Sequence, residues 1–122
     1  MIKITFCLRR LAHLSRAEFQ DYWLNNHGPL VRQQREALRF RRYVQLHAGF
    51  DELTARVSEA RGAPPPYDGV AELWWQDIED LTAATATKEG RAAGRLLLED
   101  ERKFIDLANS PIWFGEEHVI VG

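Results

Sequence analysis

Apolar residues stand at every second position from Ile2 to Leu8, with more polar residues between them. This period of two predicts a half-buried first strand. Ser15 and Glu18 then have the spacing of a capping box, in which the serine hydroxyl accepts from the Glu18 backbone and the glutamate carboxylate reaches back. We therefore expect a helix to begin directly after Ser15.

Aromatic residues mark the buried face of this first helix. Phe19, Tyr22 and Trp23 lie three and four positions apart, and His27 follows four residues after Trp23, so the histidine is expected to point inward. A Gly-Pro pair comes next. Proline has no amide hydrogen and crowds the preceding turn, although it suits the first position of a new helical segment. The sequence predicts a kinked helix with His27 at the kink.

The rest of the chain divides into three further strands and three helices. Strands are expected over 40–50, 67–76 and 112–121, and helices over 50–60, 77–87 and 89–107. This order is that of a split βαβ unit, a ferredoxin-like α+β fold with a four-stranded antiparallel sheet. We expect residues 1–122 to form a single domain, with a short helix and a proline-rich loop inserted at about 50–66.

The second and third strands carry polar groups suited to binding a ligand. If Val44 and Leu46 pack against the helices, the alternate residues of their strand face the other way. The corresponding face of the third strand supplies a carboxylate and an aromatic side chain. The residues expected on this shared face are Tyr43, Gln45, His47, Glu72 and Trp74.

The third strand is apolar on both of its faces, with Val70 and Trp74 on one and Ala71, Leu73 and Trp75 on the other. Both helices of a split βαβ unit cover the same face of the sheet, so the other face needs a second cover. We expect that cover to be the sheet of a second copy. The predicted assembly is a homodimer in which two sheets form one α+β barrel.

Composition and charge argue against some classes of binding partner and favour one cellular compartment. A net charge of −2 argues against a basic nucleic-acid-binding body, and the lack of an apolar run of about 18 residues argues against membrane insertion. The single cysteine excludes an internal disulfide and fits a cytoplasmic protein. The four histidines have no metal-ligand spacing, so no metal site is expected.

Six segments spread along nearly the whole chain carry a resemblance: Met1–Arg10, Ser15–Trp23, His27–Val31, Arg42–Gln45, Gly69–Trp74 and Glu116–Ile120. They resemble the EthD family of the dimeric α+β barrel superfamily, most specifically in the helix that ends in His-Gly-Pro-Leu. The resemblance implies a protein similar to small cyclases, dehydratases, decarboxylases and lactone isomerases. These enzymes work without cofactors, in a pocket between the sheet and the kinked helix. The family is also associated with oxidative ether degradation and is often filed under oxidoreductases.

His27 is the candidate catalytic residue, because an imidazole with a pKa near 6.5 serves as a general acid or base. The alternative is a helix-end histidine that bonds a free carbonyl. The expected substrate-binding residues would orient a carbonyl or hydroxyl compound, or would merely satisfy one another in an interface. They are Tyr43, Gln45, His47, Glu72, Trp74, Trp23 and Asn26.

Three functions remain open at this point. The first is a cofactor-free enzyme that moves a proton on a small aromatic or polyketide-like carbonyl compound, in a dehydration, decarboxylation, cyclisation or isomerisation. The second is a non-catalytic ligand-binding protein of an oxidative degradation pathway. The third is an oxidoreductase that uses haem or peroxide on the same scaffold.

Overall fold

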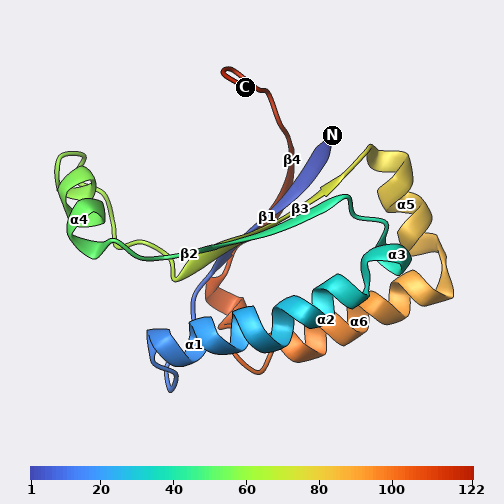
Figure 1. The fold of residues 1–122 in the computed structure, drawn as a ribbon, viewed down its shortest axis with the longest axis horizontal. Coiled ribbons are helices and arrows are strands. Elements are labelled where there is room, and N and C mark those ends of the chain that lie inside the picture. The colour runs from blue at the N-terminus through green and yellow to red at the C-terminus, as the bar shows by residue number, and fades with distance from the viewer.

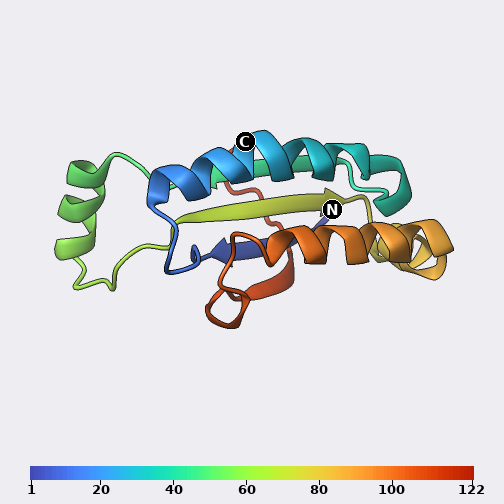
Figure 2. The same cartoon turned by 90° about the horizontal axis from the view of Figure 1, so that it is seen from below.

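The computed structural model covers residues 1–122 and has one layer of helices on one face of a four-stranded sheet (Figures 1 and 2). The strand order is β2-β3-β1-β4, and all neighbouring strands are antiparallel. This confirms the ferredoxin-like α+β fold. The strands are β1 (Ile2–Leu8), β2 (Arg42–His47), β3 (Gly69–Trp75) and β4 (Ile112–Glu116).

Two long helical segments run side by side beneath the sheet (Figure 2). The first begins at the predicted capping box of Ser15 and Glu18. The second is α6, with α5 and a short 3₁₀ turn flanking it. The helices are α1 (Arg16–Tyr22), α2 (Gly28–Gln33), α3 (Arg35–Leu38), α4 (Asp51–Glu59), α5 (Ile78–Ala86) and α6 (Lys88–Glu101), with 3₁₀ turn Leu107–Asn109.

The helix continues through the Gly-Pro pair, and its geometry changes at the position predicted for the kink. A π-helical turn over Trp23–His27 joins α1 directly to α2, and the backbone of Gly28 remains right-handed helical. The Gly28 amide donates to the carbonyl of Trp23, five residues earlier. Pro29 lies in the first turn of α2, directly after this wider turn, which is where the helical hydrogen-bond pattern changes. One wider turn therefore accommodates the proline.

Sheet register reverses the expected orientation of β2. Tyr43 pairs with Leu73 and Gln45 pairs with Ala71, and directly paired residues share a face. Ala71 belongs to the main core beneath the helices, so Tyr43, Gln45 and His47 face the helices. Val44 and Leu46 lie on the open face instead. The core cluster comprises Phe6, Leu8, Phe19, Trp23, Ala71, Phe104 and Ile105.

Trp74 lies on the open face as predicted, but it is not exposed there. The side chains of Lys3 and Arg42 lie over its ring, and its indole nitrogen donates to Glu117, which leaves the residue 8% exposed. Glu72 is on the same face, where its carboxylate pairs with Lys3 at 2.7 Å. The apolar patch expected around Trp74 is therefore covered by charged groups of its own chain.

Several boundaries are shorter than the sequence pattern suggested. The second strand ends at His47, the fourth at Glu116, and the last long helix at Glu101. The short helix predicted within the insertion is present as α4, and Figure 1 shows it standing away from the body of the molecule beyond the end of β2 and β3. None of the helices has the length and apolar character required to cross a lipid bilayer.

Candidate functional site

His27 points inward from the π-helical turn and meets a carboxylate of α6. Its Nδ1 lies 2.7 Å from Oδ2 of Asp100, and both side chains are buried. A carboxylate only accepts, so Nδ1 carries the hydrogen and donates it. This arrangement leaves Nε2 as the free, basic nitrogen of the ring. No hydrogen bond to Nε2 is present in the structure, and the atom is not sealed from solvent.

Asp100 is held in its ionised form by three donors. Tyr22 donates its hydroxyl hydrogen at 2.6 Å, His27 donates from Nδ1, and the Lys103 ammonium lies 3.4 Å away. Burial alone would raise the pKa of Asp100, but these hydrogen bonds outweigh it and the pKa is lowered. Burial also lowers the pKa of His27, despite the opposing effect of Asp100. At neutral pH the pair is a neutral imidazole beside a carboxylate.

A small cavity of about 50 Å³ lies between the sheet and the two helices, and His27 lines it. Its wall is otherwise apolar except for Tyr43 and Glu101. Burial raises the pKa of Glu101 to about 7, with a further contribution from the neighbouring Asp100 charge. Burial raises the pKa of Tyr43 to about 12, so the phenol stays protonated. Three groups able to exchange protons thus surround one small apolar space.

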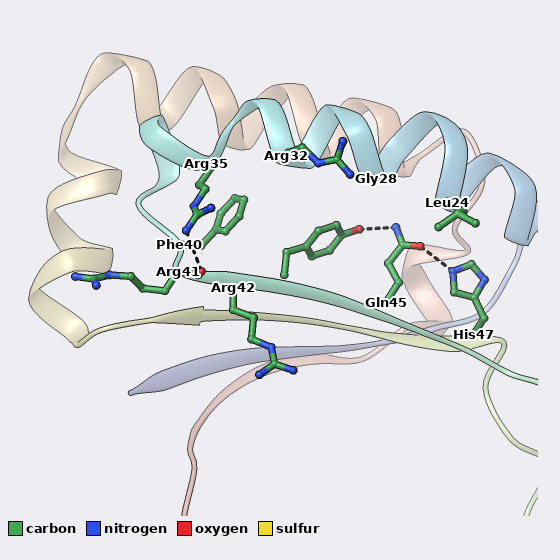
Figure 3. Close-up of a pocket in the computed structure, with 10 residues that line it drawn as sticks. Leu24, Gly28, Arg32, Arg35, Phe40, Arg41, Arg42, Gln45 and His47 are labelled. Carbon is green, nitrogen blue, oxygen red and sulfur yellow. Dashed lines mark hydrogen bonds between the residues drawn. The ribbon is translucent and has the colours of Figure 1, made fainter.

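A hydrogen-bonded chain runs along the helix-facing side of β2 (Figure 3). Gln45 Nε2 donates to the Tyr43 hydroxyl at 2.7 Å and to the Trp23 carbonyl at 2.9 Å. His47 Nε2 lies 2.7 Å from Gln45 Oε1 and therefore donates to it, while its ring stacks on Trp23 at 4.4 Å. Because the Tyr43 oxygen accepts from Gln45, its own hydrogen remains available to another acceptor.

Outside this chain lies an open groove of about 430 Å³, between α2 and the edge strand β2 (Figure 3). Tyr43 lines both the groove and the inner cavity, so its side chain is the wall between them. Gly28 brings the helix close to the strand, because an added Cβ would lie 3.2 Å from Gln45 Nε2. The groove has the volume of a small-molecule site.

The predicted site residues fall into three places. His27, Trp23 and Tyr43 meet at the inner cavity, and Gln45 and His47 line the groove beside it. Glu72 and Trp74 lie on the opposite face of the sheet, so they do not join this cluster. Asn26 is exposed, because it precedes His27 on the helix and is turned toward solvent.

The sequence pattern did not indicate Asp100 and Glu101 as site residues. They stand in a charged run at the end of α6, which is typical of a solvated helix end. A signal was nevertheless present, since Asp100 lies three residues after Leu97 and four before Phe104, on the apolar stripe of the helix. Nowhere in the chain do three or more His, Cys, Asp or Glu side chains gather as metal ligands would.

The EthD domain model matches residues 11–108. An EthD family protein of Bacillus halodurans has a similar structure, with a TM-score of 0.62 and 23% identity over 97% of this chain and 99% of that one. A dimeric protein of Bacteroides fragilis with a ferredoxin-like fold has a TM-score of 0.58 and 9% identity, over 95% of each chain.

A variant of SnoaB, a cofactor-independent oxygenase from Streptomyces nogalater, has a TM-score of 0.50 and 18% identity, over 98% of this chain and 96% of that one. No curated protein matches the chain. At these identities the solved structures establish the fold alone. The domain match spans most of the chain, including the helix that carries His27 and the helix that carries Asp100. The chain therefore belongs to the EthD family.

Proposed function

We propose that this protein is a cofactor-free enzyme that transfers a proton on a small aromatic or polyketide-like carbonyl compound. One observation carries the proposal: Asp100 fixes the hydrogen of His27 on Nδ1, which leaves a basic Nε2 at an apolar cavity. A base with its partner nitrogen tied to a carboxylate has a fixed tautomer and orientation. Such a base would abstract a proton from carbon next to a carbonyl.

Tyr43 supplies the complementary electrophile. Abstraction of the proton leaves negative charge on the substrate oxygen, which a neutral hydrogen-bond donor stabilises. The Tyr43 hydroxyl accepts from Gln45 and has its own hydrogen free, and its high pKa keeps that hydrogen in place. Glu101, with a pKa of about 7, would return a proton to a leaving hydroxyl or to carbon.

The size of the inner cavity adds one requirement. About 50 Å³ is room for little more than one or two water molecules, not for an aromatic substrate. The substrate body would therefore occupy the groove, and the Tyr43 side chain would rotate to join the two spaces. The reacting carbon would then reach His27 while the ring system stays in the groove.

The elementary step can be tested before the natural substrate is known. We would incubate the protein in D₂O with a panel of aromatic β-keto compounds and follow deuterium incorporation beside the carbonyl by NMR. Catalysed exchange is expected for at least one compound, with a loss of about 100-fold or more in His27→Gln, as for removal of a general base. Glu99→Gln, an exposed neighbour of Asp100, is the control and should keep full activity. Exchange that persists in His27→Gln would refute the role of His27.

A non-catalytic binding protein is the second candidate, and the small volume of the inner cavity favours it. If Tyr43 never moves, a ligand in the groove would not reach His27. Ligand binding without exchange for any bound compound would support this alternative.

An oxygenase reaction is the third candidate, suggested by the description of SnoaB. A carbanion formed by His27 would also be the electron-rich species that reacts with dioxygen. Oxygen consumption that depends on both substrate and His27 would separate this reaction from a dehydration or isomerisation.

A further inference from the structure

We infer that the groove between α2 and β2 binds a planar aromatic carboxylate that carries a second oxygen, either carbonyl or hydroxyl. This inference deepens the proposed function by naming the substrate class. It rests on that function only in calling the bound ligand a substrate. The binding itself is argued from the groove and is measured without turnover.

The groove is lined by cationic side chains and by no acidic ones. Four of its ten lining residues are arginines, and none is an aspartate or glutamate. The whole chain carries a net charge of −2, so this cluster is not a sample of a generally basic surface. A concave surface lined by one sign of charge concentrates ligands of the opposite sign.

Two of these arginines are free to bind. Arg32 makes no ion pair or hydrogen bond, and Arg35 makes only one weak contact, to the Arg41 carbonyl at 3.3 Å. They lie three residues apart and so share one side of the helical segment, above the groove (Figure 3). The guanidinium groups of the other two are engaged elsewhere, Arg42 over Trp74 and Arg41 4.0 Å from Asp80. Guanidinium groups match the geometry of a carboxylate.

The groove also has apolar and aromatic lining residues along its length (Figure 3). Leu24, Phe40 and Tyr43 are its hydrophobic lining, and the rings of the last two lie 6.4 Å apart. A flat ring system would pack against these side chains, whereas a bare inorganic anion would gain nothing from them. The volume of about 430 Å³ suits two fused rings with substituents.

The β2 side of the groove offers a single directed donor. Gln45 is fully occupied by Tyr43, Trp23 and His47, so its amide has no hydrogen left to donate. The Tyr43 hydroxyl hydrogen has no acceptor and is the group that remains. An oxygen on the ligand, either carbonyl or hydroxyl, would accept it. The guanidinium groups and this one donor together define the orientation of the ligand.

A matched set of three probes tests the inference by titration calorimetry on the full chain at low salt. The probes are a hydroxynaphthoate with its two groups on different rings, the naphthoate without the hydroxyl, and the hydroxynaphthamide without the charge. We expect the hydroxynaphthoate to bind at least tenfold more tightly than the amide, and more tightly than the plain naphthoate. Equal affinity for acid and amide would overturn the inference, as would displacement of the acid by inorganic phosphate at equal concentration.

Substitutions of Arg32 and Arg35 test whether these two arginines cause the preference for the acid over the amide. In the double variant Arg32→Gln/Arg35→Gln the preference for acid over amide should fall to within twofold. The charge-conserving Arg32→Lys/Arg35→Lys should retain much of it. Arg56→Gln/Arg95→Gln removes the same total charge from exposed positions outside the groove and should leave the preference unchanged. A preference that survives in Arg32→Gln/Arg35→Gln would contradict the assignment.

His27→Gln separates this inference from the proposed function. That variant should bind hydroxynaphthoate like the parent, because His27 does not line the groove. Selective binding without proton exchange would refute the proposed function alone. Proton exchange without selective binding would refute the present inference alone.

Discussion

His27 and Asp100 meet at 2.7 Å although 73 positions separate them in the chain. The histidine comes from the π-helical turn and the aspartate from the last turn of α6, so the contact fixes two helices relative to each other. The same contact fixes the tautomer of the imidazole. The pair therefore both holds the two helices together and sets the tautomer of the histidine. A single substitution can test both roles.

Asp100→Asn should change the tautomer of His27 and weaken the fold. Asparagine offers one acceptor oxygen to two donors, Tyr22 and His27, and its amide can donate to Nδ1 instead. Nitrogen-15 NMR of the imidazole should then move from the Nδ1–H form toward the Nε2–H form. Urea unfolding should register a loss of about 1–3 kcal/mol for a buried donor left without a partner. Glu99→Gln serves as the exposed control, and an unchanged tautomer in Asp100→Asn would contradict the assignment.

Glu101 should make the protein less stable as the pH rises. Its pKa in the folded state is about 7 and its ordinary value is 4.5, so the folded state binds the proton more tightly than the unfolded chain. The stabilisation is complete below about pH 4.5 and is lost as the pH rises through about 7. His27, with a lowered pKa, acts in the opposite direction, because its stabilising effect is lost as the pH falls below 6.5.

Glu101→Gln isolates the carboxyl from this opposing effect. Relative to the parent, the variant should gain on the order of 2 kcal/mol in free energy of unfolding between pH 4.5 and pH 8. Chemical denaturation at several pH values measures the difference. A difference that stays constant with pH would show that Glu101 titrates normally.

The sequence pattern predicted strand existence better than strand orientation. Alternation along β2 separated two sets of residues correctly, but both sets contain polar members, so polarity could not indicate which set faces the helices. The packing of Trp23 decided it, because its ring accepts the stacked His47 and its carbonyl accepts Gln45. These contacts join segments more than 20 residues apart, which a local period cannot represent.

The candidate site was predictable only in part for the same reason. The inward orientation of His27 followed from its spacing after Trp23, and the structure confirms that it is 5% exposed. Asp100 depended on the neighbouring helix, so a search for charged residues on apolar stripes would have been needed to find it. Glu72 and Trp74 were placed with the wrong group because their face was inferred from the reversed orientation of β2.

Gly69→Ala should destabilise the fold, because the glycine lets the Trp23 ring pack on the backbone of β3. An added Cβ would overlap that ring and the Leu46 carbonyl. We expect a loss of about 1–3 kcal/mol in free energy of unfolding, as for overpacked cores. Gly94→Ala is the matched control in open space on α6, and it should be neutral or stabilise by about 0.5–1 kcal/mol. Equal effects of the two substitutions would contradict this account of the packing.

A homodimer through the open face of the sheet remains a prediction. Trp74 is covered, but Leu46 is 62% exposed and Trp113 is 50% exposed, and both lie on that face. The similar protein from Bacteroides fragilis is described as dimeric. Sedimentation at micromolar concentration should give about twice the chain mass of 14.1 kDa.

Two charge substitutions locate the interface. Trp113→Glu should shift the mass toward that of the monomer, because an unpaired charge would be buried between the sheets. Leu53→Glu places the same charge on the exposed surface of α4 and should leave the mass unchanged. A parent protein of 14.1 kDa at all accessible concentrations would rule out this assembly.

The π-helical turn also affects how the helix tolerates the insertion or deletion of one residue. Such a turn uses one residue more than an α-helical turn to cover about the same rotation, so the helix can absorb one additional residue without moving either of its halves. Loss of one residue between Trp23 and His27 would therefore spare the sheet and the core. It would, however, return the Trp23 carbonyl to ordinary helical bonding and release Gln45 from it. Among relatives, we expect a one-residue gap at this point to separate members that anchor their strand glutamine from members that leave it free.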